Sequence, residues 1–309
     1  MPRHLPAEGA VAAAGGSAPA DVPPGWARLA CALLLLAGAA SANAAASGDA
    51  SRGEYLAKAG GCAACHTEDR KDAAILAGGH PLRTPYGTFY GPNLTPHPQA
   101  GLGRWTEADF VRAMRAGVRP DGAHYYPAFP YPSFTRISDA DLADLWAYLR
   151  SLAPDSRPNR AHELRFPFGW RYAIAAWKWL FFTPGPFASD ARRPAAVNRG
   201  AYLVDVLGHC GECHTPRNFL GALKRDRPFA GGKGPTGKDV PNLTPTRLKK
   251  WSDAELKEFL VSGITPEFDS ADEAMAEVVR NTTSQLTPAD LTAMIAYLRA
   301  LPPLPEVSR

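Results

Sequence analysis

The stretch GGCAACHTED, residues 60–69, places two cysteines three positions apart and a histidine directly after the second. The same pattern returns in GHCGECHTPR, residues 208–217. The chain of 309 residues has five cysteines, and the fifth, Cys31, lies in an N-terminal leader. Every cysteine that follows the leader therefore belongs to a C-x-x-C-H unit.

The two units are typical of covalent haem attachment. They comprise Cys62, Cys65 and His66 in the first, and Cys210, Cys213 and His214 in the second. Residues three positions apart lie on one face of a helical turn, so both thiols of a unit can reach the vinyl groups on one porphyrin edge. The histidine then faces the iron from the same side. Two covalently bound haem c groups are predicted.

Three other uses of paired cysteines fit less well. A thioredoxin-like redox pair needs a surrounding α/β fold, for which the sequence gives no sign. A zinc site formed by both pairs would leave the two histidines unexplained, and structural disulfides rarely close a gap of two residues. Zinc and disulfide sites remain the alternatives to haem.

The chain repeats itself well beyond these units. Four further segments recur in the same order, with offsets between 146 and 149 residues. They are RGEYL (52–56) and RGAYL (199–203), PNLTP (92–96 and 241–245), WTEADF (105–110) and WSDAEL (251–256), and ISDADLADLWAYLRSLAP (137–154) and LTPADLTAMIAYLRALPP (286–303). A duplicated module of about 110 residues is therefore predicted.

The repeated segments carry helix signals. Ser138 and Thr287 stand at N-cap positions, with acidic residues after them and proline at the far end. The segments 105–117 and 251–263 have the same form, with a Thr or Ser cap, early acids and a final glycine. Because no strand alternation is visible, we expect an all-α fold.

Length and composition suggest two ordinary domains and no nucleic-acid partner. A net charge of +4 without a basic block gives nucleic acid nothing to bind. Arg28 precedes an apolar run of 12 residues, 29–40, and an A-x-A site at 42–44. This pattern predicts a cleaved signal peptide over 1–44 and a periplasmic location; an uncleaved anchor is the alternative.

With these motifs the sequence resembles the class I cytochromes c, over nearly everything after residue 48. The resemblance implies two tandem domains, 48–154 and 196–309, joined by a Trp-rich linker over 155–195. GPNL (91–94) and VPNL (240–243) are similar to the loop whose proline carbonyl accepts a hydrogen bond from the axial histidine. It implies that Pro92 holds His66 and Pro241 holds His214.

A closer resemblance lies in TPYGTFYGPNLTP (84–96), YPAFPYPSF (126–134) and GHCGECHTPRN (208–218). These segments resemble the cytochrome c subunits of membrane-associated alcohol and gluconate dehydrogenases of bacteria. The resemblance implies electron transfer from a dehydrogenase catalytic subunit to quinone or a terminal oxidase. Such relatives commonly carry three haems, whereas this chain has two attachment units, so its electron exit is open.

The two modules differ in the residue available as the sixth ligand of the haem iron. Met275 follows His214 by 61 residues, in the loop region where the resemblance places the methionine ligand. Its counterpart is Phe129 by one count and Tyr126 by another, and neither binds iron. We therefore expect the first haem to be held by His66 and His124. An open iron or another ligand is the alternative, with His80 and His97 less well placed.

The linker is rich in aromatic residues. Residues 166–182, FPFGWRYAIAAWKWLFF, hold three of the seven tryptophans, and Arg171 and Lys178 share one helical face. The segment is either a strap between the domains or a docking surface for a membrane or partner subunit. For the whole chain, an electron carrier is the main prediction. A dihaem peroxidase or sulfur-compound oxidase with an open first haem is the alternative.

Overall fold

The computed structural model describes residues 48–234 and 237–307. The leader, with the predicted signal peptide over 1–44, lies outside the described residues. The described part is mainly helical, as predicted. None of its helices is long and apolar enough to cross a membrane.

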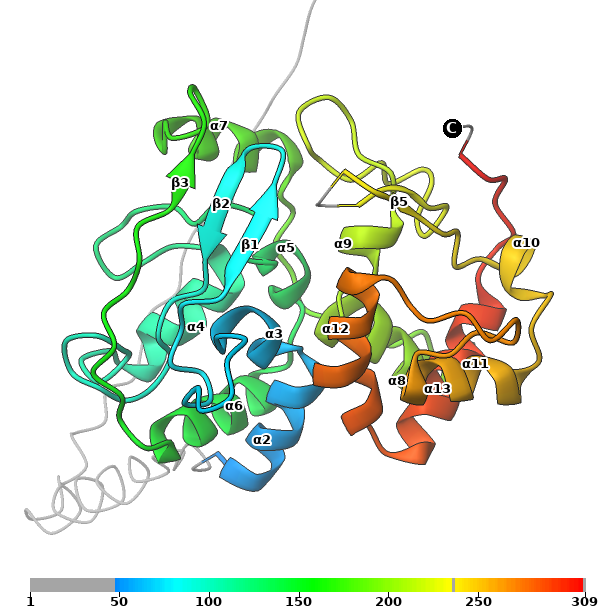
Figure 1. Ribbon diagram of the computed structural model, residues 1–309, viewed down its shortest axis with the longest axis horizontal. Helices are drawn as coiled ribbons and strands as arrows, with labels where there is room; N and C mark the ends of the chain where they lie inside the picture. The colour runs from blue at the N-terminus through cyan, green and yellow to red at the C-terminus, as the bar shows by residue number, and fades with distance from the viewer. Residues whose placement is uncertain (1–47, 235–236, 308–309) are drawn as a thin grey trace, which may run out of the picture. The chain divides into compact units, whose positions relative to one another are not determined.

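The helices and strands fall into two similar sets separated by the linker (Figure 1). Module 1, residues 48–154, contains α2 (Ala50–Ala59), α3 (Cys62–His66), β1 (Pro81–Thr84), β2 (Gly87–Tyr90), α4 (Glu107–Ala116), α5 (Tyr131–Phe134) and α6 (Asp139–Ser151). The linker contains β3 (Glu163–Leu164) and α7 (Tyr172–Phe181). Module 2 follows the linker and begins one residue before the predicted boundary at 196. It contains α8 (Ala195–Ala201), a π-helix (Tyr202–Leu207), α9 (Gly211–His214), β4 (Gly232–Lys233), β5 (Asp239–Val240), α10 (Pro245–Leu248), α11 (Asp253–Ser262), α12 (Glu273–Asn281), a 3₁₀ turn (Thr283–Gln285) and α13 (Pro288–Ala300).

The predicted helix signals are confirmed in both modules. Thr106 caps α4 and forms a capping box with Asp109, and Ser252 and Glu255 do the same for α11. Both helices end at a glycine in the left-handed conformation, where a side chain would be strained. Ser138 and Thr287 cap α6 and α13 through their side chains.

In each module the first helix crosses the last at a glycine. Helix α2 packs on α6, and α8 packs on α13 (Figure 1). A Cβ atom on Gly53 would lie 1.9 Å from the Asp144 carbonyl oxygen, and one on Gly200 would lie 1.9 Å from that of Ala293. The glycine of the repeated RG-x-YL segment therefore lets the two backbones touch.

Short strands are present that the sequence analysis did not expect. β1 and β2 form an antiparallel hairpin, and β3 pairs with β2. Gly87, at φ 125°, allows the tight turn between β1 and β2. Strands of two to four residues are too short to give a readable alternation of apolar and polar side chains.

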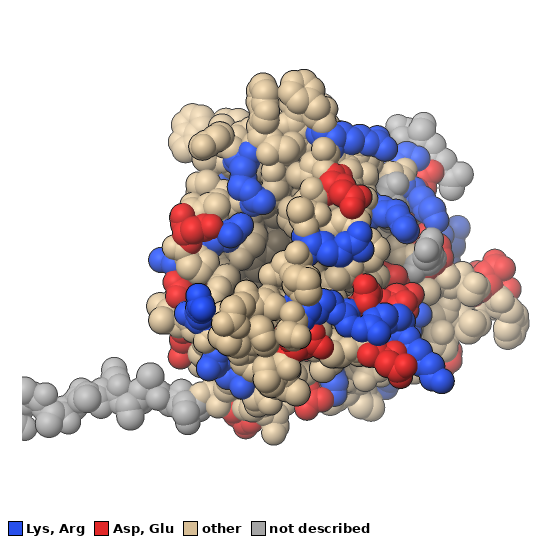
Figure 2. All heavy atoms as spheres, turned by 60° about the vertical axis from the view of Figure 1, so that its left-hand side comes forward, with Lys and Arg blue, Asp and Glu red and all other residues tan. Residues whose placement is uncertain are grey.

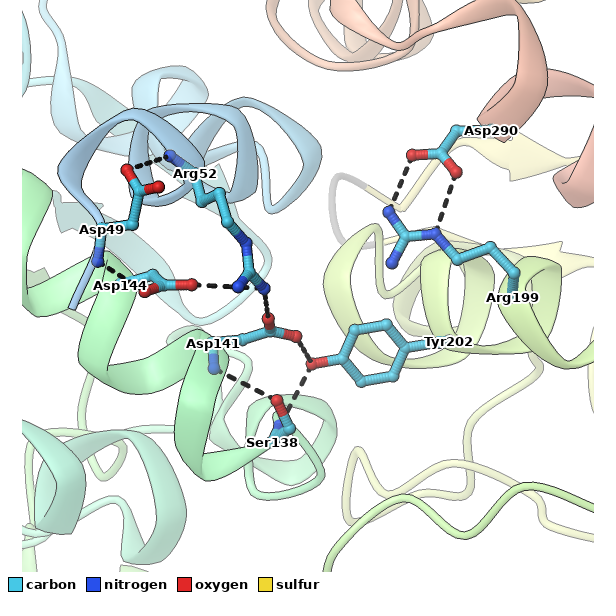
Figure 3. Close-up of polar contacts among 8 residues, drawn as sticks. All are labelled: Asp49, Arg52, Ser138, Asp141, Asp144, Arg199, Tyr202 and Asp290. Carbon is cyan, nitrogen blue, oxygen red and sulfur yellow. Dashed lines mark hydrogen bonds and ion pairs between the residues drawn. The ribbon is translucent and has the colours of Figure 1, made fainter. Parts of the chain in front are cut away.

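The two modules meet through reciprocal contacts of the same repeated residues. Tyr202 of module 2 donates a hydrogen bond to Asp141 Oδ2 (2.6 Å) and accepts one from the Ser138 N–H (3.1 Å; Figure 3). Tyr55 of module 1 makes the same pair of contacts with Asp290 (2.6 Å) and the Thr287 N–H (3.2 Å). Such an exchange of equivalent contacts is the pattern of a two-fold interface, and it fixes one module against the other.

The linker helix α7 packs its one cation inward. Lys178 is buried, whereas Tyr172 is 95% and Trp179 84% exposed. Trp177 donates its indole N–H to the Leu220 carbonyl of module 2 (2.9 Å). Figure 1 draws α7 and β3 at the top of the molecule. At the top of Figure 2, which is turned about the vertical axis, uncharged side chains project from the surface, with Lys and Arg beside them. Within the described residues the linker thus packs on module 2 through its inner face and exposes apolar side chains on its outer face.

Candidate functional site

Each C-x-x-C-H unit forms one helical turn. In module 1 the turn is α3, which follows Gly61 in the left-handed conformation. In module 2 Cys210 is the N-cap residue of α9 and His214 its last residue. Both cysteines and the histidine of a unit therefore come from a single turn, as the spacing predicts.

No disulfide joins the four cysteines of the two units. Burial raises the pKa of Cys62 and Cys210 to about 12, and that of Cys65 and Cys213 to about 11. Among the described residues, no cluster of three or more His, Cys, Asp or Glu could hold a metal ion.

Both histidines are oriented by a proline carbonyl. His66 Nδ1 lies 2.7 Å from the Pro92 carbonyl oxygen, and His214 Nδ1 lies 2.8 Å from that of Pro241. A carbonyl only accepts, so Nδ1 carries the proton and Nε2 keeps a free lone pair. Burial lowers the pKa of both rings, which favours the neutral form. This is the tautomer that an axial haem ligand needs, so the residues present fit the predicted group.

The proline loop is held close to the attachment turn by glycine. A Cβ atom on Gly91 would lie 1.7 Å from the Cys65 carbonyl oxygen. Gly78 and Gly231, at φ 81° and 79°, lie under the proline segment of their modules, where a Cβ would come within 3.0 Å of its backbone. Only glycine lets the loop approach closely enough for the histidine to reach the proline carbonyl.

The sequence analysis missed the residues that lock this loop. The Asn93 side chain accepts hydrogen bonds from the Thr95 N–H and hydroxyl, and its amide donates to the Asp155 carbonyl. Asn242 repeats these contacts with Thr244 and the Leu304 carbonyl. The exact repetition of PNLTP was the available signal, since three of its five residues, the first proline, the asparagine and the threonine, make these contacts or the histidine bond.

Backbone hydrogen bonds favour Phe129 over Tyr126 as the counterpart of Met275. The N–H of Tyr125 donates to the Gly117 carbonyl, and the N–H of Ala271 donates to that of Gly263, an offset of 146. The loops before them match at the same offset, with bridges Val118↔His124 and Ile264↔Ser270. Counting four residues further on at this offset pairs Phe129 with Met275. The backbones differ from there on, because Met275 lies in the first turn of α12, whereas Phe129 precedes α5.

His124 lies against the linker. Lys178 Nζ lies 2.9 Å from His124 Nδ1 and also donates to the Ala116 carbonyl at the end of α4. Arg171 donates to the His124 carbonyl oxygen (2.9 Å). An ammonium group only donates, so Nδ1 accepts and the proton of the neutral ring is on Nε2. In this arrangement His124 has no free Nε2 lone pair to offer iron.

The attachment turn of module 2 lies against α5 of module 1, at the module interface. The His209 ring is 5.3 Å from the ring of Phe134, and Ser133 donates to Glu212 (3.4 Å). The raised pKa of the Cys213 thiol comes first from burial and then from Glu212, with a smaller contribution from Cys65 of module 1. Helix α12 of module 2 also contacts α3 (Figure 1).

Comparison with known proteins gives the same picture. The cytochrome c family profile matches residues 50–153. The chain is 45% identical over 287 residues to a dihaem c-type cytochrome of Cereibacter sphaeroides, which covers 88% of this chain and 96% of the relative.

Two further relatives are cytochrome c subunits of dehydrogenases. One belongs to the quinone alcohol dehydrogenase of Gluconobacter oxydans, at 38% identity over 91% of this chain and 61% of the relative. The other belongs to gluconate 2-dehydrogenase of Pantoea cypripedii, at 37% identity over 81% of this chain and 59% of the relative. The chain thus spans about three fifths of their length. Because the alignment with the dihaem relative runs through both attachment turns, the chain belongs to the c-type cytochromes and is an electron carrier with two covalently bound haem c groups.

Proposed function

We propose that the chain is the electron-transfer subunit of a periplasmic dehydrogenase complex. It would accept electrons from the catalytic subunit and deliver them to quinone or a terminal oxidase. The observation that carries this proposal is the contact of the second attachment turn with module 1, where the Ser133 hydroxyl of α5 lies 3.4 Å from Glu212, while helix α12 of module 2 contacts α3. Two haems attached there would exchange electrons across the interface, and the reciprocal tyrosine contacts would keep their separation constant.

The residues would divide the work in a simple way. The cysteines form the thioether links: Cys62, Cys65, Cys210 and Cys213. His66 and His214 are the proximal ligands, made stronger donors by Pro92 and Pro241. Met275, half-buried against the core, is the sixth ligand of the second haem, where a thioether raises the reduction potential. His124, the ligand expected for the first haem, would first have to leave Lys178.

The test begins with the intact exported protein. Mass spectrometry and a haem-stained denaturing gel should show two haems on a chain that has lost its leader. Purification from the native membrane fraction should bring down a dehydrogenase catalytic subunit, and its substrate should reduce both haems in the complex. If the chain carries two haems but no dehydrogenase subunit copurifies with it and reduces them, the chain serves another pathway and the proposed role is overturned.

The outer face of α7 would attach the chain to a membrane surface. It is apolar and aromatic, and Arg225, which donates to the Phe181 carbonyl (2.9 Å), supplies a cation at its edge. Tyr172→Ser with Trp179→Ser should weaken sedimentation with vesicles of anionic lipid. Trp177→Phe is the matched control, because Trp177 faces module 2. If the double variant sediments like the wild type, the membrane contact lies elsewhere.

A further inference from the structure

The distal side of the first haem differs from that of the second at one equivalent position. Phe129 takes the place of Met275 when counted at the offset of the loops 117–125 and 263–271, whose backbone hydrogen bonds match. Phe129 is half-buried, with its ring 5.2 Å from that of Tyr125 and 5.9 Å from that of Phe134. A phenyl ring has no lone pair for iron, so the position fills space and supplies no ligand.

The methionine and the histidines of module 1 outside its attachment turn have partners elsewhere. Met114 is a core residue of α4, 8% exposed, and its counterpart in α11 is the equally buried Leu260. His97 Nδ1 accepts from the Gln99 and Ala100 N–H groups. His80 faces Glu277 of α12, with 3.9 Å between Nε2 and Oε2.

The two histidines nearest the linker are held as well. His162 Nδ1 accepts from the Tyr90 N–H (3.2 Å). His124 Nδ1 accepts from Lys178, a buried ammonium that also binds the end of α4. The contact of Lys178 with both the ring and a helix terminus resists any movement of His124, because moving the ring would leave a buried charge with fewer acceptors.

From these contacts we propose that the first haem has no side-chain ligand on its distal side, so that its iron takes a small exogenous ligand. The second haem, with Met275, is closed to such ligands. The expected ligands are small molecules that have a lone pair and fit beside an aromatic ring. Carbon monoxide is the probe of this class for the reduced protein. This inference rests on the haem-ligand assignment made under the proposed function.

Carbon monoxide uptake by the reduced full-length chain counts the open irons. The wild type should take up one molecule per chain, and its oxidised spectrum should show one high-spin and one low-spin haem. Phe129→Met should abolish the uptake and double the near-infrared sulfur-to-iron band. Met275→Phe should raise the uptake to two and remove that band. The exchanged double variant, Phe129→Met with Met275→Phe, should return the uptake to one.

His124→Ala separates this inference from ligation by histidine, since it should leave the wild-type spectrum and uptake unchanged. A low-spin wild type that ignores carbon monoxide would overturn the inference, and so would a His124→Ala variant that gains uptake. Haem content, measured by mass on every variant, shows whether attachment itself has failed. If Met275→Phe keeps both haems yet leaves uptake at one, Met275 is not the ligand of the second haem, and the assignment made under the proposed function fails. If Phe129→Met keeps both haems yet still takes up carbon monoxide, the equivalence of Phe129 and Met275 is wrong.

Discussion

Replacing Tyr202 by phenylalanine removes one hydroxyl from the centre of the module interface. The hydroxyl is buried, donates to Asp141 Oδ2 at 2.6 Å and accepts from the Ser138 N–H at 3.1 Å. Arg52 pairs with the other carboxylate oxygen, Oδ1, at 3.2 Å (Figure 3). Nothing else bonds to Oδ2 among the contacts of the described residues, so the variant leaves a charged oxygen and an N–H without their partner.

A hydrogen bond to a charged group contributes about 1.5–3 kcal/mol, and leaving a buried partner unsatisfied costs in the same range. We therefore expect Tyr202→Phe to lower the free energy of unfolding by about 2–3 kcal/mol. Tyr55→Phe is the matched control at the equivalent position. Its acceptor, Asp290, keeps two N–H groups of Arg199 at 2.8 and 2.9 Å, and Tyr55 is only half-buried. That variant should cost about 1 kcal/mol.

The assay is denaturant unfolding of the haem-loaded chain, followed by both tryptophan fluorescence and far-ultraviolet circular dichroism. Coincident transitions would justify a single free energy for the two modules together. Separate transitions in Tyr202→Phe alone would show that the interface couples them. A cost below about 0.5 kcal/mol for Tyr202→Phe, or an equal or larger cost for Tyr55→Phe, would refute this reading of the interface.

Three further changes test other parts of the fold. Gly200→Ala places a Cβ 1.9 Å from the Ala293 carbonyl oxygen, so it should prevent stable folding of module 2. Gly122→Ala is the control: its Cβ points into open space, and it should cost about 1 kcal/mol for the left-handed φ of 82°. Thermal unfolding of the two variants compares these costs. Asn242→Ala removes the lock on the Pro241 loop and should lower the yield of chains with two haems, as measured by mass, while Asn218→Ala should not. Burial acts to raise the pKa of Asp290, but the hydrogen bonds from Arg199 and Tyr55 lower this pKa below its usual range. The ionised Asp290 therefore contributes to stability above about pH 4, and this contribution is lost as pH falls through the folded pKa. Unfolding of Asp290→Asn at a series of pH values should lack this part of the acid dependence.

The attachment turns and the long helices can be predicted from local signals in the sequence. A cap, an early acid and a final glycine act within one helix, so α4 and α11 can be predicted from their own residues. The internal repeat adds that both modules share these elements. The contacts between modules have no such signal: Tyr55 and Asp290 are 235 residues apart, and either side chain alone would be read as a solvated polar group.

The linker shows a different limit of sequence reasoning. Arg171 and Lys178 share one face, as predicted, but a charged face normally points to water. Here that face turns inward, because the carbonyl oxygens of Ala116 and Gly117 end α4 and accept from Lys178. The proline at position 120 removes the N–H that would bond Ala116 within a continued helix. Only the tertiary structure brings this acceptor to the cation.

The two modules share the backbone of the loop that precedes the distal position. The loops 117–125 and 263–271 close with the same main-chain hydrogen bonds. Beyond these loops module 2 forms α12, which contains Met275, whereas Phe129 precedes the short α5. The ligand offered to iron therefore changes just after a loop that both modules keep. The symmetric interface holds the modules together in either case, since Tyr55 and Tyr202 lie outside the distal loops. A duplicated scaffold can in this way carry two haems of different ligation at a fixed separation, and the direction of electron flow between them depends on that ligation.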